Sequence, residues 1–112
     1  MATILVVDDS LTELHVLKGL LEKNGYSVQT AEDGAQDIEA AKEHQPDLIL
    51  MDVVMPVLNG FQATRQLHRD PATADIPVIM VTTKDQETDR SWGLRQGAVD
   101  YVVKPVDAKA LL

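Results

Sequence analysis

Residues 48–52 have the sequence Leu-Ile-Leu-Met-Asp, in which four large apolar residues are followed by an aspartate. Similar uninterrupted apolar runs lie at residues 4–7 and 78–81. Because the apolar residues of these runs are continuous and do not alternate with polar ones, they predict strands that are covered on both faces, as in a parallel sheet. Weaker apolar runs at residues 27–31 and 99–103 predict two further strands.

Segments with helical spacing separate the predicted strands. Ser10 and Glu13 form a capping-box pattern, and the leucines at positions 14, 17 and 21 then share one helix face. Asp33 and Gln36 repeat the capping pattern before a second helix. The predicted helices follow Ser10, Asp33 and Asn59 and end near Gly25, Pro46 and Pro71, and a fourth spans about residues 86–96 before Gly97.

The alternation of strands and helices predicts a single domain, residues 1–112, with a doubly wound α/β fold around five parallel strands. A fifth helix would begin at Asp107, where only residues 108–112 remain to build it. A full fifth helix would cover apolar side chains of the sheet. We therefore expect either a natural chain about ten residues longer, which would complete a helix of ordinary length, or a neighbouring molecule over that face.

The composition excludes several classes of protein. The chain has a formal net charge of −8, which opposes direct binding to nucleic acid or to an anionic membrane surface. It contains no cysteine, which excludes disulfides, thiolate metal sites and cysteine nucleophiles. No apolar run approaches the ~20 residues of a membrane span, and acidic residues follow the first run directly. We therefore expect a cytoplasmic protein without a signal peptide or membrane insertion.

Polar side chains follow four of the predicted strands. Asp8 and Asp9 come after the first strand, Asp52 after the third, Thr82 after the fourth and Lys104 after the fifth. Ligands of an open α/β sheet bind outside the carboxyl ends of its strands, so these side chains are expected to converge at one edge. The first two aspartates could by themselves merely cap a helix, but three carboxylates in one place repel one another. A hard divalent cation held by oxygen atoms would offset that repulsion, which predicts a Mg²⁺ site.

Five short motifs occur in order along the chain. They are Val6-Val7-Asp8-Asp9-Ser10, Leu50-Met51-Asp52-Val53-Val54-Met55-Pro56, Asn59-Gly60, Val81-Thr82 and Tyr101-Val102-Val103-Lys104-Pro105. In these motifs the chain resembles a response-regulator receiver domain, the CheY-like family, along all of its length except the last helix. The resemblance implies strand order 2-1-3-4-5 and a role in two-component signal transduction. Residues 59–67, 82–89 and 104–107 further resemble the PilH-type regulators of type IV pilus twitching motility.

The resemblance assigns roles to the residues at the sheet edge. Asp52 would be the phosphoacceptor and would attack the phosphorus of a phosphohistidine. Lys104 would bring an ammonium group to the phosphoryl oxygens, and Thr82 would donate its hydroxyl to them after transfer. Bound Mg²⁺ would neutralise charge on the transferring group. Its ligands would be Asp8, Asp9, Asp52 and the backbone carbonyl of Val54.

Further roles implied by the resemblance concern switching and signal lifetime. Phosphorylation would draw Thr82 toward the phosphoryl group and turn the Tyr101 ring inward, changing an output face made of the fourth helix, the fifth strand and the fifth helix. Alternatively, Tyr101 is a static aromatic residue of an edge strand. Val54 and Lys84 would flank the path of attacking water, and because Val54 cannot orient water we expect slow self-dephosphorylation. The Lys104–Pro105 peptide bond would be cis.

The resemblance implies a histidine kinase of the chemotaxis type as phosphoryl donor and a downstream motility protein as target, with the chain a monomer or a weak dimer. It would be a phosphorelay switch that catalyses only its own phosphorylation and dephosphorylation. Two alternatives remain. The chain could be the receiver part of a larger regulator with an output domain, or a Mg²⁺-dependent phosphohydrolase with an aspartyl-phosphate intermediate. Hydrolases of the haloacid-dehalogenase type, however, carry an acid/base aspartate at the position of Val54.

The remaining chemically active side chains indicate no second site. His15, His44 and His68 lie in separate segments without metal-ligand spacing, and we expect them to be surface or helix-face residues. Trp92 is either a half-buried packing residue or an exposed anchor for a partner, and we favour packing.

Overall fold

The computed structural model describes residues 2–53, 59–82 and 87–103, which form five strands and four helices. In chain order these are β1 (Thr3–Val7), α1 (Leu11–Lys23), β2 (Ser27–Ala31), α2 (Gly34–His44), β3 (Leu48–Met51), α3 (Gly60–Arg69), β4 (Val78–Thr82), α4 (Glu87–Arg95) and β5 (Asp100–Val103). Each strand predicted from the sequence is present, with bounds that differ by no more than one residue at either end. The segment expected to begin a fifth helix lies outside the described residues.

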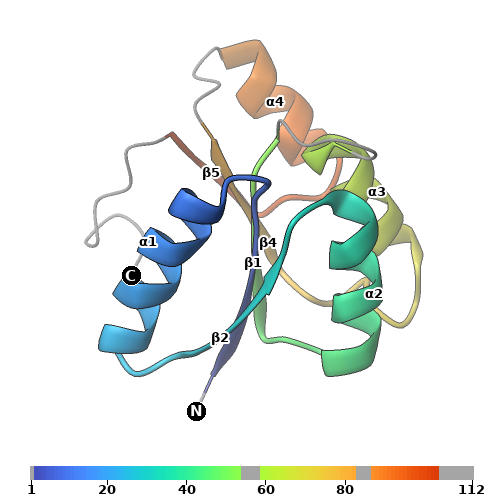
Figure 1. The fold of residues 1–112 in the computed structure, drawn as a ribbon. Helices are drawn as coiled ribbons and strands as arrows, with labels where there is room; N and C mark the ends of the chain where they lie inside the picture. The colour runs from blue at the N-terminus through green and yellow to red at the C-terminus, as the bar shows by residue number, and fades with distance from the viewer. Residues whose placement is uncertain (1, 54–58, 83–86, 104–112) are drawn as a thin grey trace.

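The strands form one parallel sheet in the order β2-β1-β3-β4-β5 (Figure 1), which confirms the predicted fold class and strand order. The chain winds in one direction from β1 to β2 and in the other from β3 to β5. As a result, α1 covers one face of the sheet, and α2 and α3 cover the other (Figure 1). The carboxyl ends of β1 and β3 lie side by side where the winding changes direction, which is where open α/β sheets bind ligands.

The core consists of apolar clusters on both faces of the sheet. Alternate residues of a strand point to opposite faces. On one face of β1, Leu5 and Val7 pack in a cluster with residues of α2 and α3. On the other face, Ile4 and Val6 pack with the leucines of α1. Both faces of β1 are therefore buried, which explains why its apolar run is continuous.

Three helices begin at the capping residues that the sequence predicts. Ser10, Asp33 and Asn59 each accept a hydrogen bond from the backbone N–H three residues later, at 3.3, 2.8 and 2.9 Å. At α3 the cap is reciprocal, because the Asn59 N–H donates to Oε1 of Gln62 at 3.1 Å. These bonds satisfy N–H groups that have no partner within the helix.

The helix ends also agree with the predicted breakers. α2 ends at His44, and Gln45 takes a left-handed conformation (φ 48°) directly before Pro46. The proline ring disfavours the α conformation in the residue before it, so the helix does not continue. After α1, Gly25 has a φ of 92°, a value that favours glycine. Within the described ranges, no helix is long and apolar enough to cross a membrane.

Candidate functional site

The candidate site lies at the carboxyl ends of β1 and β3. Asp8 follows β1 directly, and its N–H donates to the carbonyl oxygen of Ala31 at the end of β2 (3.1 Å). Asp52 follows β3, and its N–H donates to the carbonyl oxygen of Val7 (2.9 Å). The sheet hydrogen bonding thus continues one residue beyond the strands, which holds the backbones of both aspartates in register.

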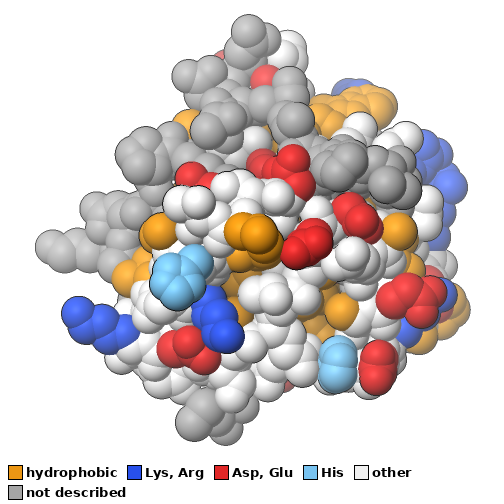
Figure 2. Space-filling view, viewed as in Figure 1, with side chains coloured by type: hydrophobic (Ala, Val, Ile, Leu, Met, Phe, Trp, Pro, Cys, Tyr) orange, Lys and Arg blue, Asp and Glu red, His pale blue; other side chains and the backbone are white. Residues whose placement is uncertain are grey.

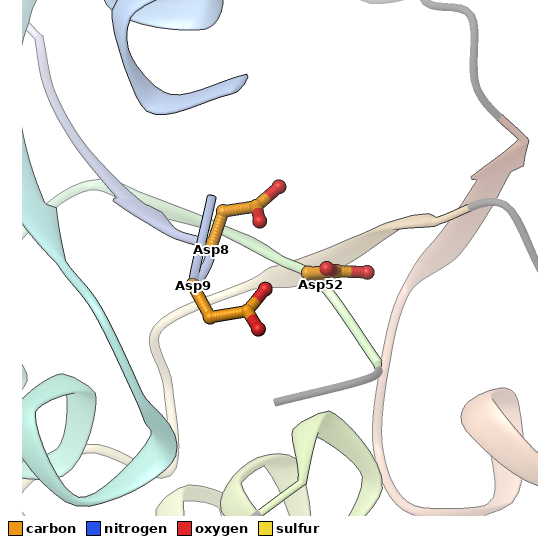
Figure 3. Close-up of side chains that lie close together, drawn as sticks. All are labelled: Asp8, Asp9 and Asp52. Atoms are coloured by element: carbon orange, nitrogen blue, oxygen red, sulfur yellow. The ribbon is translucent and has the colours of Figure 1, made fainter. Parts of the chain in front are cut away.

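Asp8, Asp9 and Asp52 come together here as the carboxylate cluster. Each offers a carboxylate oxygen, and these oxygens all lie within 4.8 Å of one another. The carboxylates point to the same side of the sheet edge (Figure 3). Asp8 and Asp52 are only 2% and 9% exposed, whereas Asp9 is exposed to solvent. The structure therefore brings together the three aspartates that the sequence analysis selected.

Backbone N–H groups orient two of these carboxylates. The Ser10 N–H donates to Oδ1 of Asp8 at 3.0 Å, and the Val53 N–H donates to Oδ1 of Asp52 at 2.8 Å. Three carboxylates at such short separations repel one another, and burial of two of them weakens the screening by water. Hard oxygen donors in this arrangement suit a small divalent cation such as Mg²⁺.

The first turn of α3 supports the loop that carries Asp52. The Gly60 N–H donates to the carbonyl oxygen of Val53 (2.9 Å). A Cβ atom on Gly60 would lie 2.8 Å from Cα of Val53 and would also collide with the carbonyl oxygen of Asp52. Glycine is therefore required for the helix to approach this closely. Asn59-Gly60 is recognisable as a motif in the sequence, but this role of the glycine was not predicted; the local signal for it is its position directly after a helix cap.

Thr82 and Tyr101 lie on neighbouring strands beyond β3. Thr82 is the last residue of β4 and is fully buried. Tyr101 pairs in register with Met80 of β4, and its ring is buried under α4, where a Cβ atom on Gly93 would lie 3.1 Å from Cδ2 of Tyr101. β5 is an edge strand, yet this ring faces the core.

Several predicted site residues lie outside the described part of the chain. These are Val54, Lys84, Lys104 and Pro105. Four predictions concern these positions and stay predictions. They are the metal ligand at the Val54 carbonyl, the control of dephosphorylation by Val54 and Lys84, the ammonium group of Lys104, and the cis peptide bond between Lys104 and Pro105.

The three histidines lie on the surface, as expected, and none belongs to the carboxylate cluster. Trp92 is 48% exposed, so it is half covered by packing and half available to solvent. Asp37 lies on α2 and is completely buried, although no pattern in the sequence singled it out.

The profile of the response regulator receiver domain matches residues 4–112. The chain belongs to this family. Receiver domains are phosphorelay switches of two-component systems: they take a phosphoryl group from a histidine kinase and bind downstream partners.

Curated relatives share this receiver domain in different contexts. The protein PilH of Pseudomonas aeruginosa is 60% identical over 112 residues, which are 100% of this chain and 93% of PilH. The response regulator PleD of Caulobacter vibrioides is 43% identical over 106 residues, which are 95% of this chain but only 23% of PleD. The receiver domain thus occurs both in a relative of nearly the same length and in a much longer one.

Solved structures agree with the fold. The chemotaxis protein CheY4 of Vibrio cholerae superposes with a TM-score of 0.92 at 32% identity, covering 99% of this chain and 92% of that one. The receiver domain of the sensor histidine kinase PA1611 from P. aeruginosa superposes with a TM-score of 0.90 at 34% identity, covering 98% and 90%. That structure has a magnesium ion coordinated in the active site cleft.

Proposed function

We propose that this chain is a phosphorylation-controlled switch in which Asp52 accepts a phosphoryl group from a histidine kinase in the presence of Mg²⁺. The observation that carries the proposal is the carboxylate cluster, whose oxygen atoms lie within 4.8 Å of one another. Asp52 is the member next to β4, so it lies between the Asp8–Asp9 pair and Thr82. This central position suits the residue that carries the phosphoryl group.

In the proposed reaction, a carboxylate oxygen of Asp52 attacks the phosphorus of a phosphohistidine. The P–N bond breaks, and the imidazole leaves with the electron pair and takes up a proton. Mg²⁺ would supply positive charge against the phosphoryl oxygens. Asp8, Asp9 and the backbone carbonyl of Val54 would hold the ion together with Asp52, and Lys104 would place its ammonium group beside the same oxygens.

Signal transfer would pass through Thr82 and Tyr101. The Thr82 hydroxyl would bond the phosphoryl group, and the Tyr101 ring would respond to the space that this movement opens. Burial of both side chains on adjacent strands supports the proposal, because a shift of one changes the packing of the other. The lifetime of the phosphoryl group would depend on Val54 and Lys84.

The similarity to PilH supports a role in type IV pilus twitching motility, with a kinase of the chemotaxis type as donor and a motility protein as target. The fold and the carboxylate cluster are compatible with any receiver domain. The proposed role in twitching motility therefore rests on the sequence similarity to PilH.

The site assignment is tested by incubating the chain with acetyl phosphate and Mg²⁺ and locating the phosphoryl group by mass spectrometry. We expect labelling of Asp52, none in Asp52→Asn, and none when the metal is chelated. Asp75→Asn removes one charge from an exposed position at the amino end of β4 and should label normally. Labelling of the Asp52→Asn variant at the wild-type rate would refute the assignment.

A further inference from the structure

A groove of unusual composition lies between α3 and α4. Its volume is about 340 Å³. In the described part of the chain, its lining residues are Arg65, His68, Arg69, Trp92, Arg95 and Gln96. On each wall the residues have the spacing i, i+3, i+4. One wall is a face of α3, and the other consists of α4 residues together with Gln96, which directly follows α4. We call this feature the α3–α4 groove.

The charge of the α3–α4 groove is opposite to that of the whole chain. The chain has a net charge of −8 and four arginines, three of which line this groove. Among the residues that the structure describes, no aspartate or glutamate lines it. Lys and Arg side chains gather at the upper right edge of the molecule, over α3, beside exposed hydrophobic side chains (Figure 2). Like charges gathered in this way repel one another, so an anionic occupant would be stabilised.

The acidic residues of the described segments do not neutralise these arginines. Asp70 directly follows Arg69 but pairs with Lys42 of α2, whose Nζ lies 3.2 Å from Oδ2 of Asp70. Arg90, which is not part of the groove, pairs with Asp100 at 3.7 Å. Among the described residues, Arg65, Arg69 and Arg95 form no ion pair with a carboxylate. Their guanidinium groups are therefore available for bidentate bonds to an outside carboxylate.

The groove has an apolar anchor point and a close contact between its two walls. Trp92 exposes 48% of its surface, in a chain that has no other tryptophan. Gly97 follows α4 with a φ of 114°, and a Cβ atom there would lie 2.9 Å from Cγ of His68. The His68 ring thus packs against the backbone of Gly97 and holds α3 beside the end of α4. Tryptophan and arginine are the residues that most often dominate binding energy at protein interfaces.

We propose that the α3–α4 groove binds an acidic, amphipathic helical segment of a partner protein. Apolar side chains of that segment would pack on Trp92, and carboxylates one turn apart would meet Arg65 and Arg69 on one wall and Arg95 on the other. Positions i and i+4 are separated by about 6 Å along a helix, so arginines at this spacing match carboxylates at the same spacing in the partner.

This interaction is independent of the proposed phosphorylation chemistry. No residue of the α3–α4 groove belongs to the carboxylate cluster, so binding can be measured on the unphosphorylated chain. Charge reversals in the groove should leave labelling by acetyl phosphate unchanged, which also shows that the variant is folded. Failure of one proposal therefore leaves the other intact.

The test uses a synthetic peptide of about 18 residues, long enough to be helical, with glutamates on one face, leucines on the other and no tryptophan. Trp92 then reports binding directly, and we expect its emission to shift to shorter wavelength as the peptide covers it. In Arg65→Glu/Arg69→Glu the affinity should fall by about ten-fold or more, and added salt should weaken binding to the wild type. Lys18→Glu/Lys23→Glu changes the net charge equally at exposed positions of α1 and should bind within about two-fold of the wild type.

Four results would overturn the proposal. These are no binding at about 1 mM peptide, equal loss of affinity in both double variants, equal binding of a peptide with glutamines in place of glutamates, and tighter binding of inorganic phosphate or of a nucleotide than of the peptide. A salt-sensitive dimer that forms without peptide and is lost in Arg65→Glu/Arg69→Glu would instead make a second copy of the chain the occupant.

Discussion

At the scale of single residues, Asp37 is an acidic side chain in a buried position. It lies on α2 with no exposed surface, and within the described segments neither of its carboxylate oxygens has a hydrogen-bond partner. Burial raises the pKa of this carboxyl group to about 8, because a charged carboxylate is poorly solvated there. The folded protein therefore keeps a proton on Asp37 at pH values where the unfolded chain has lost it.

This difference in protonation predicts a pH-dependent stability. Between about pH 4 and pH 8 the folded state binds more protons than the unfolded state, so the free energy of unfolding should fall as pH rises through this window. Asp37→Ala removes the group and should stabilise the protein by about 2–4 kcal/mol at pH 8, but by much less at pH 5. Urea unfolding of both proteins at the two pH values measures this. An equal gain at both would show that burial of the charge is not the cause.

At the scale of secondary-structure elements, the amino end of α3 determines where the Asp52 loop lies. Asn59 closes the reciprocal cap, and Gly60 lets the helix approach the backbone of Asp52 and Val53. α3 carries no residue of the carboxylate cluster, but its first turn determines the position of Asp52.

Gly60→Ala should therefore lower both stability and phosphorylation. The added Cβ atom would meet backbone atoms, which cannot rotate away, so we expect a loss of about 1–3 kcal/mol and a slower rate of labelling by acetyl phosphate. Gly19→Ala is the matched control, because a Cβ atom there meets nothing within 4 Å in the middle of α1. That change should raise stability by about 0.5–1 kcal/mol. Similar effects of the two substitutions would mean that the approach of α3 is not tight.

At the scale of the whole molecule, the proposed metal site at the carboxylate cluster would link the stability of the sheet to binding of a cation. β1 and β3 are neighbours in the sheet, and each is followed directly by an acidic residue of the cluster. The repulsion between these residues opposes the folded state. A cation that binds only the folded form stabilises it by mass action.

Mg²⁺ at ten times its dissociation constant should raise the free energy of unfolding by about 1.4 kcal/mol, which corresponds to several degrees in Tm. Asp9→Asn should melt higher than the wild type without metal, because one repelling charge is gone, and should gain less from Mg²⁺. Calorimetry at constant ionic strength separates metal binding from screening, and Asp75→Asn serves as the control. A rise in Tm that is the same in Asp9→Asn and the wild type would contradict a site at the cluster.

The bounds of the central elements could be predicted almost completely from the sequence. Strands β1, β3 and β4 are buried on both faces, so their apolar runs are continuous and easily recognised. β2 and β5 are the edge strands. Fewer of their residues are buried, so their apolar runs in the sequence are weaker. The predicted start of the last strand was one residue early, since Val99 is exposed and β5 begins at Asp100.

The sequence by itself determined the parallel strands, the helix caps and the meeting of Asp8, Asp9 and Asp52. These follow from local patterns and from a general property of parallel sheets, whose carboxyl ends share one edge. Only the tertiary structure decided that Asp37 is buried, that Gly60 touches the Asp52 loop, and that arginines from two helices share the α3–α4 groove. Helical periodicity defines the faces of a helix, but what each face meets depends on packing between elements far apart in the chain.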